Sequence, residues 1–375
     1  MSPLPARLPR DLHPVAWWLW ALGLAAGASM TTNPLLLGLL VAVASLVVAV
    51  RRSDHPWSRS FRIYLWIGLA IVVIRVLFRI LMGGGYGTRV LFTLPEIPLP
   101  DWVLDVQLLG AVTQESLLAG LYDGMRLATI VICIGAANAL ANPKRLLKSV
   151  PPALYEIGTA LVVAVTVLPQ LADSVRRVRA AQALRPGPTG RVGRLRRFLV
   201  PVLEDALERS LQLAAGMDAR GYGRSAGLTV GQRRVTGALM LGGLIGVCIG
   251  VYAVLDTTAP RYLALPLLLG GLLVALLGMA NAGRRVERSR YRPDRWRAPE
   301  IVIASAGLLV GALLRQVSRS DLDTAYPSLL AMPEVTLLAL LAVLLGALPA
   351  LVAPPAATVS AREAARDTAP VGAAA

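Results

Sequence analysis

Long runs of apolar residues constrain this 375-residue chain more than any other feature of its sequence. A helix needs about 20 largely apolar residues to cross a bilayer, and it satisfies its own backbone hydrogen bonds there. The mean hydropathy of +0.62 is too high for a soluble globular protein. The sequence therefore predicts an all-α polytopic membrane protein with about eight transmembrane helices, at residues 15–30, 34–50, 63–82, 111–140, 235–255, 262–281, 301–314 and 335–351.

The net charge of +16 comes mostly from arginines that lie between these runs. Basic loops of a membrane protein face the cytoplasm and are attracted to anionic lipid, so this distribution points to a lipid bilayer and not to nucleic acid. Acidic loops at residues 83–110 and 321–334 fit the external side. We expect a multi-pass protein of the cell (plasma) membrane with both termini cytoplasmic.

The apolar stretch 153–168 does not fit this alternation of sides. Basic residues precede it at 144–148, and eight arginines follow it at 176–197 with no acidic residue among them. Both flanks are expected on the cytoplasmic side, so a single crossing between them is excluded. We expect a long helix that lies along the cytoplasmic face, with an amphipathic second half.

A second amphipathic helix is predicted from about residue 202 to Ala219. Leu203, Leu207 and Leu211 recur at helical spacing on one side, acidic and basic residues occupy the other, and Gly221 ends the helix. The two helices form a cytoplasmic module at residues 142–234. It lies between an N-terminal transmembrane bundle at 1–141 and C-terminal transmembrane helices at 235–353, and a disordered tail is expected at 354–375.

Searches for reactive motifs point away from an enzyme. The sequence contains no GxxxxGK[ST] phosphate loop and no HExxH, CxxC or GxSxG motif. Cys133 and Cys248 lie singly inside apolar runs, and the two histidines are far apart in polar flanks. We therefore expect neither a cofactor nor a metal site.

Two arginines end the two amphipathic helices in a related way. Arg185 follows Ala183 and Leu184, and Arg220 stands between Ala219 and Gly221. A cation in the last helical turn stabilises the helix by about 0.3–1 kcal/mol, which explains any single arginine of this kind. Small neighbours at both ends also allow an arginine to enter a groove and bind a carboxylate of a partner, and we favour this second interpretation.

Four charges lie within the third and fourth runs. Arg75 and Arg79 are one helical turn apart, and Glu115 and Asp123 lie at a comparable depth in the next run. Charges within a membrane are costly and are usually paired. We expect Arg75 and Arg79 to pair with Glu115 and Asp123, as structural ion pairs and not as a transport pathway.

Several segments resemble the T-component, the EcfT/CbiQ-like transmembrane subunit of energy-coupling factor transporters. LAAGMDARGYGR at 213–224 is similar to the second Ala-Arg-Gly motif of the family, and 178–186 is similar to the first. The stretch 142–171 resembles the segment that precedes the first motif, and TTNPLLL resembles the actinobacterial branch. The resemblance extends from about Met30 to Leu255.

The resemblance implies a coupling subunit between two ABC-type ATPase subunits and a substrate-binding membrane S-component, with a vitamin or a metal ion as the imported substrate. ATP hydrolysis is then expected in the partner subunits. By position, Arg185 and Arg220 would be the coupling arginines, with Ala183, Ala219 and Gly221 as their small neighbours. The first motif departs from the family pattern, because Leu184 and Pro186 replace alanine and glycine.

Two other functions are compatible with a polytopic membrane protein. A stand-alone secondary transporter would carry polar or broken helices near the middle of the membrane, and the sequence shows few. An integral membrane enzyme that acts on lipid would carry a cluster of acids or histidines at one face, which the sequence lacks.

Overall fold

The computed structural model of the chain describes residues 11–53, 60–82, 87–95, 109–184, 191–221, 230–256, 261–283 and 295–355. The chain divides into two compact units, one made of residues 1–146 and 294–375 and the other of residues 147–293. The first unit thus combines the N-terminal 146 residues with the C-terminal helices, and the segment expected at 235–353 is divided between the units.

The first unit begins with a helical hairpin of α1 (Pro14–Ser29) and α2 (Pro34–Arg51). Each helix has proline in its first turn, where the missing N–H costs nothing, and a side chain that caps the start. The His13 ring accepts a hydrogen bond from the Val15 N–H, and the Asn33 side chain accepts one from the Leu35 N–H. A short turn at residues 30–33 joins the two helices.

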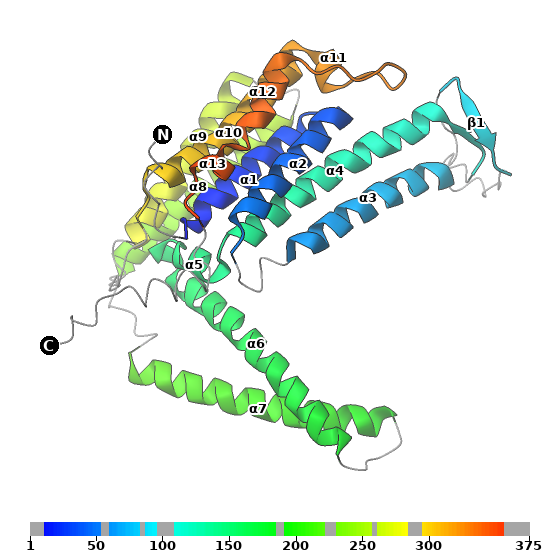
Figure 1. Ribbon diagram of the computed structural model, residues 1–375. Helices are drawn as coiled ribbons and strands as arrows, with labels where there is room; N and C mark the ends of the chain where they lie inside the picture. Colours follow the sequence, from blue (N-terminus) through cyan, green and yellow to red (C-terminus); the bar gives the residue numbers. More distant parts are fainter. Residues whose placement is uncertain are drawn as a thin grey trace, which may run out of the picture. The chain divides into compact units, whose positions relative to one another are not determined.

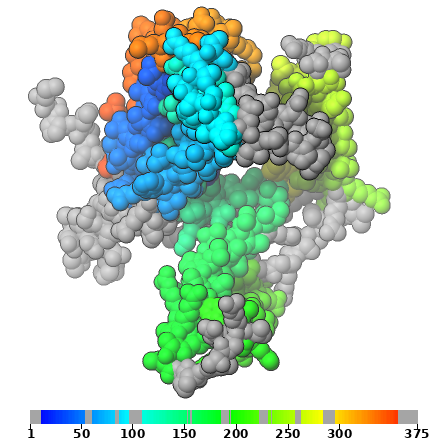
Figure 2. Space-filling view, turned by 90° about the vertical axis from the view of Figure 1, so that its right-hand side faces the viewer, coloured from blue at the N-terminus to red at the C-terminus, as the bar shows by residue number. Residues whose placement is uncertain are grey.

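Helix α10 (Ala298–Ser320) packs parallel to α1 at very short range (Figure 1). A side chain added at Gly307 would collide with the backbone of Trp20, and one added at Gly311 would lie 2.9 Å from the carbonyl oxygen of Gly23. Small residues four apart allow two helix backbones to approach closely inside a membrane. In the space-filling view the orange α10–α11 segment lies against the blue N-terminal helices (Figure 2).

The remaining C-terminal helices complete this packing. They are α11 (Leu322–Ala325), α12 (Leu337–Leu345) and α13 (Leu348–Val352). The run expected as a single span at 335–351 is therefore two short helices, separated at Gly346. The carbonyl of Gly346 accepts a hydrogen bond of 3.0 Å from the buried Trp20 indole, which connects this break to α1.

Helices α3 (Phe61–Leu81) and α4 (Gln114–Leu140) form an antiparallel pair. Gly68 of α3 lies against Ile132, and Gly124 of α4 lies against Val72, so glycines again mark the closest approach. Two short strands, β1 (Val90–Thr93) and β2 (Ala111–Thr113), lie in the chain between the end of α3 and the start of α4. They pair antiparallel, and the pairing register shifts between Val90 and Phe92. This small hairpin was not expected from the sequence.

The first unit has two distinct ends. At one end the Asp11 carbonyl accepts a hydrogen bond from Arg145, and the rings of His13 and Trp296 lie 5.2 Å apart. At the same end Arg51 donates to the carbonyl of Ala350. The start of α1, the end of α4, the start of α10 and the end of α13 thus meet at this end, which we call the basic end.

At the opposite end the α1–α2 turn contacts the α11 region. Asn33 donates to the carbonyls of Thr324 and Glu334, and Thr31 donates to the carbonyl of Ala325. Asn33 is fully buried, so these bonds satisfy a side chain that would otherwise be costly to bury.

The second unit consists of two helical pairs. A short 3-10 turn, η2 (Pro152–Leu154), leads into α6 (Tyr155–Ala183), which is followed by α7 (Arg191–Ala219). Helices α8 (Val230–Leu255) and α9 (Arg261–Gly283) then pair antiparallel, with Gly246 against Gly271 and Gly250 against Leu268. The six-residue α5 (Pro143–Lys148) lies where the division between the units falls.

Among the described residues, seven helices are long and apolar enough to cross a membrane by length and composition. Six of them match expected spans: α2, α3, α4, α8, α9 and α10. The seventh is Ile157–Ala183 in α6, which the alternation of sides predicted to remain on one face. The expected spans at 15–30 and 335–351 are shorter, at 16 residues for α1 and 9 residues for α12.

Candidate functional site

Helices α6 and α7 cross antiparallel, and polar contacts hold the crossing together (Figure 1). Arg177 lies 3.4 Å from the Asp205 carboxylate, and the Gln182 side chain donates to the Arg197 carbonyl at 2.7 Å. The Arg179 guanidinium lies 5.5 Å from the centre of the Phe198 ring, within the range of a cation–π interaction. The two helices therefore meet between the last turns of α6 and the first half of α7.

Asp205 is the central acid of this crossing. A hydrogen bond from the Ser174 hydroxyl lowers the pKa of Asp205 most, and Arg209 and Arg177 lower it further, against the opposing effect of burial. Arg209 follows Asp205 by one turn, and its guanidinium lies 3.1 Å from the carboxylate. The i,i+4 spacing of Asp205 and Arg209 allows their pair within one helix, whereas Ser174 and Arg177 lie on the other helix and could not be assigned to it from spacing.

Helix α7 is longer than expected. The sequence predicted a start near residue 202, but the helix begins at Arg191 and carries Pro201 inside. The segment before the proline is rich in arginine and leucine, both good helix formers, and it packs against α6 through Phe198. Tertiary contact thus outweighs the local effect of proline here.

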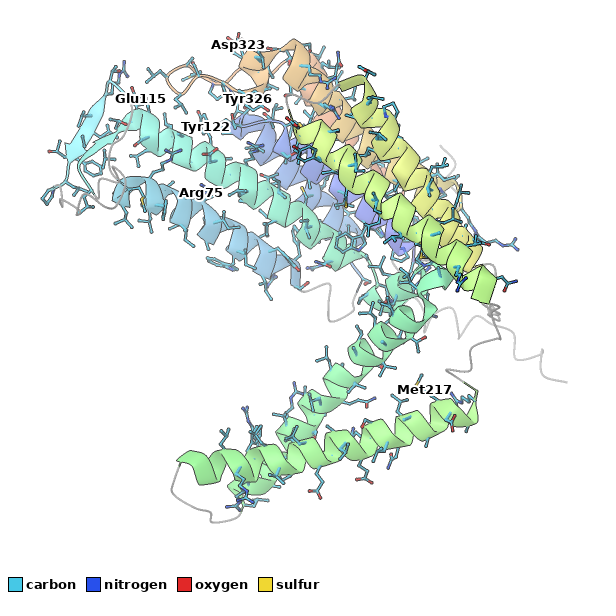
Figure 3. The ribbon with its side chains drawn as sticks, turned by 180° about the vertical axis from the view of Figure 1, so that it is seen from behind. Arg75, Glu115, Tyr122, Met217, Asp323 and Tyr326 are labelled. Carbon is cyan, nitrogen blue, oxygen red and sulfur yellow. The ribbon has the colours of Figure 1, made fainter. Side chains whose placement is uncertain are left out.

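The C-terminal half of α7 is exposed along the described residues. Leu203, Leu207 and Leu211 are 62%, 61% and 62% exposed, and they follow one another at i,i+4 spacing. Figure 3 shows this end of the helix, with Met217 labelled near its last turn. An apolar row of this length on a helix surface is typical of a face that contacts a partner or a membrane.

The Ala219-Arg220-Gly221 segment ends this exposed helix. The Arg220 N–H bonds the Met217 carbonyl at 3.1 Å, and the Gly221 N–H bonds the Asp218 carbonyl at 2.9 Å. Gly221 has φ of +74°, a left-handed conformation that favours glycine and ends helices. Arg220 is exposed, so its guanidinium stands at the tip of the helix, accessible to a partner.

The first arginine motif is only partly described. Ala183 is the last residue of α6 and is exposed, and Leu184 is 86% exposed. Arg185 lies outside the described residues, as does the tail from residue 356. The structure therefore shows a small residue and an exposed leucine at this helix end, and gives no position for the arginine.

The four charges of α3 and α4 form one of the expected ion pairs, between Arg79 and Asp123. Arg79 lies 3.7 Å from the Asp123 carboxylate. Glu115 instead accepts hydrogen bonds from the Thr88 N–H at 2.9 Å, the Thr88 hydroxyl and the Arg89 N–H. Figure 3 labels Glu115 at the first turn of α4, beside the hairpin, and Arg75 on α3.

The expected pairing of Glu115 with an arginine is therefore not formed. Residues 87–89 pass directly over its carboxylate, and a side chain added at Gly87 would collide with it. Arg75 is exposed and has no ion pair among the residues that the structure describes. Glu115 thus anchors the β1–β2 hairpin to α4, a role that sequence spacing alone could not indicate.

Metal-binding groups are not brought together in the described part of the chain. There, no three histidine, cysteine or acidic side chains come close enough to hold a metal ion. The polar groups that gather at the crossing of α6 and α7 are arginines beside single carboxylates.

Comparison with known proteins finds a matching family and a similar protein. A family model described as CbiQ, cobalt transport protein, matches residues 5–229, more than half of the chain. The energy-coupling factor transporter transmembrane protein EcfT of Leuconostoc gelidum subsp. gasicomitatum is 28% identical over 195 residues, which cover 48% of this chain and 67% of that protein. Helices α8–α13 lie beyond the residues that the family model matches.

Proposed function

Since this chain belongs to the CbiQ family of cobalt transport proteins, we propose that it is the transmembrane coupling subunit of an ATP-driven importer. In this role it transmits movement from two ABC-type ATPase subunits to a substrate-binding membrane subunit, the S-component. The imported substrate is a vitamin or a metal ion, and the S-component selects it. The chain itself carries out no chemistry.

The observation that carries this proposal is the exposed end of α7 on a crossed pair of helices. A lever needs its two helices to be joined, and the contacts of Asp205 in α7 with Ser174 and Arg177 in α6 join them. It also needs a contact at its tip, and the exposed Arg220 between two small residues suits a groove with an acidic side chain.

The geometry within each unit supports a position of α6 on one side of the membrane. The end of α4 and the start of α10 both lie at the basic end of the first unit. Residues between them must therefore cross the membrane an even number of times. Helices α8 and α9 form an antiparallel pair and account for two crossings, so α6 makes none, despite its apolar composition.

The orientation follows from the charges at the basic end. Lys144, Arg145 and Lys148 follow α4 there, and basic segments remain on the cytoplasmic side. The crossing of α6 and α7 accordingly faces the cytoplasm, where ATPase subunits are located.

Co-purification from detergent extracts tests the docking of α7. The wild-type chain is expected to retain two ATPase subunits, and Arg220→Glu is expected to release at least one, because the reversed charge would meet a carboxylate. Truncating or reversing one partner of a desolvated charge pair costs about 2–5 kcal/mol, or more than tenfold in affinity.

Arg319→Glu is the matched control, since Arg319 is exposed in the last turn of α10, at the opposite end of the first unit from the basic end. It is expected to retain both ATPases. Retention of both ATPases by Arg220→Glu, with substrate uptake intact, would show that α7 does not dock in this way.

A further inference from the structure

The crossing of α6 and α7 carries a strong positive charge. Eight arginines lie between residues 176 and 197 with no acidic residue among them. Among those described, Arg176 pairs with Asp173, Arg177 pairs with Asp205, and Arg179 covers Phe198. Arg196 is exposed, and the contacts of the described residues give it no acidic partner.

Exposed apolar side chains surround Arg196 on the surface of α7. Leu199 and Val200 follow it by three and four residues, so they are its neighbours on the helix surface, and they are 41% and 50% exposed. Leu195 and Leu203 extend the same surface and are also exposed. We call these five residues, Leu195, Arg196, Leu199, Val200 and Leu203, the basic-apolar face of α7.

This face lies beside the contact with α6. Phe198 lies under Arg179, and the buried Val202 and the half-buried Asp205 belong to the side of α7 that meets α6. At 100° per residue, the basic-apolar face occupies the neighbouring part of the helix surface, and acidic Glu204 and Glu208 lie beyond it. One helix therefore has a packed side, a basic apolar side and an acidic side.

We propose that the basic-apolar face of α7 binds the anionic lipid surface of the cytoplasmic leaflet and anchors the crossing there. A basic amphipathic helix lies in the membrane interface with leucines inserted and arginines at the level of the headgroups. An arginine buries its alkyl chain beside apolar neighbours while its guanidinium reaches a phosphate. The inference rests on the proposed function only for the cytoplasmic position of the crossing.

The chemistry favours lipid over another occupant of this face. A protein groove that covered five residues of this kind would have to match both an unpaired cation and a row of four branched apolar side chains. An anionic leaflet offers both features everywhere along its surface, because its headgroups are negative and its acyl chains are apolar. The acidic side of α7 would then face away from the leaflet, which avoids repulsion.

A fluorescent label on the full-length chain tests the contact. Cys248→Ser removes the exposed native thiol, Cys133 is buried, and Leu199→Cys then accepts an environment-sensitive dye such as NBD. In nanodiscs that contain phosphatidylglycerol, the dye emission is expected to shift to the blue relative to nanodiscs of phosphatidylcholine alone. Salt should reverse part of this shift, because about 1 M salt shortens the screening length to about 3 Å.

Two comparisons assign the shift to the face itself. Arg196→Gln is expected to lower the ratio of membrane-bound to free helix about fivefold, equivalent to about 1 kcal/mol for one basic residue at an anionic surface. Arg234→Gln removes an exposed charge at the start of α8 and is expected to leave the shift unchanged. A dye at Glu208→Cys, on the acidic side, is expected to show no shift.

Equal emission in both kinds of nanodisc, or an Arg196→Gln variant that behaves like Arg234→Gln, would overturn the lipid contact. Retention of the ATPases is measured on the same variants. Normal ATPase capture without a lipid-dependent shift would reject this inference alone, whereas loss of the effect of Arg220→Glu would reject the proposed function.

Discussion

Single glycines determine how closely the helices of the first unit approach. Gly23, Gly307 and Gly311 bring the backbones of α1 and α10 together, and Trp20 fills the space beside them with its indole bonded to Gly346. Such contacts replace the hydrophobic effect, which does not drive helices together inside lipid. The missing side chains at these glycines therefore support the contact between α1 and α10.

Gly307→Leu is expected to destabilise the protein by about 1–3 kcal/mol, since the new side chain would collide with the Trp20 backbone. Thermal unfolding of the purified protein in detergent measures the effect. Gly38→Leu in α2 is the control, because a Cβ at Gly38 meets no atom within 4 Å. An unchanged unfolding temperature for Gly307→Leu would mean that α1 and α10 do not pack at this distance.

Helices α6 and α7 are joined as one element because side chains of each helix contact the other. Asp205 accepts a hydrogen bond from the Ser174 hydroxyl and lies beside arginines from both helices. The carboxylate is partly exposed, so water and salt weaken each pair, and the network as a whole gives the crossing its geometry.

The crossing is expected to weaken in acid. The pKa of Asp205 is lower in the folded protein than in the unfolded chain, so its contribution is fully present above the unfolded value of about 3.9. It is lost as pH falls through the lower folded pKa. Distances between spin labels at Ala180→Cys and Leu195→Cys, in the Cys248→Ser background, should therefore broaden below about pH 4.

Asp205→Asn should broaden the same distances already at neutral pH and remove most of their dependence on acid. Asp173→Asn is the matched control, since Asp173 forms an exposed pair with Arg176 within α6 alone. If both variants retained the acid dependence of the wild type, another group would control the crossing.

The whole molecule is defined by which segments cross the membrane. In the first unit, α4 ends and α10 begins at the same end. The segment between these two helices must therefore cross the membrane an even number of times. Helix α6 is apolar enough to span, so composition and topology give opposite answers for it. We propose that topology takes precedence, because a chain cannot change sides without a further crossing.

Cysteine labelling from outside the cell checks this arrangement. In the Cys248→Ser background, Leu168→Cys in α6 is expected to resist a membrane-impermeant maleimide in intact cells and to react in inverted vesicles. Asp323→Cys in α11 is expected to react in intact cells, because α11 lies at the opposite end of the first unit from Arg145. Labelling of Leu168→Cys from outside would place α6 across the membrane and would contradict the proposed coupling role of α6 and α7.

Much of this protein follows from its sequence alone. Apolar runs near bilayer length determine a polytopic helical protein, since only helices satisfy their backbone within lipid, and the LAAGMDARGYGR segment indicates the family. The end of α7 at Ala219 also follows locally, because Gly221 adopts a conformation that ends helices.

Only the tertiary structure decided which segments far apart in the chain contact one another. It directed Glu115 to the β1–β2 hairpin instead of an arginine, extended α7 back through Pro201, and placed α10 against α1. Each outcome depends on contacts between residues far apart in the chain, which spacing along one helix does not record. The side on which α6 lies is likewise a property of all the helices together, because each crossing constrains the next.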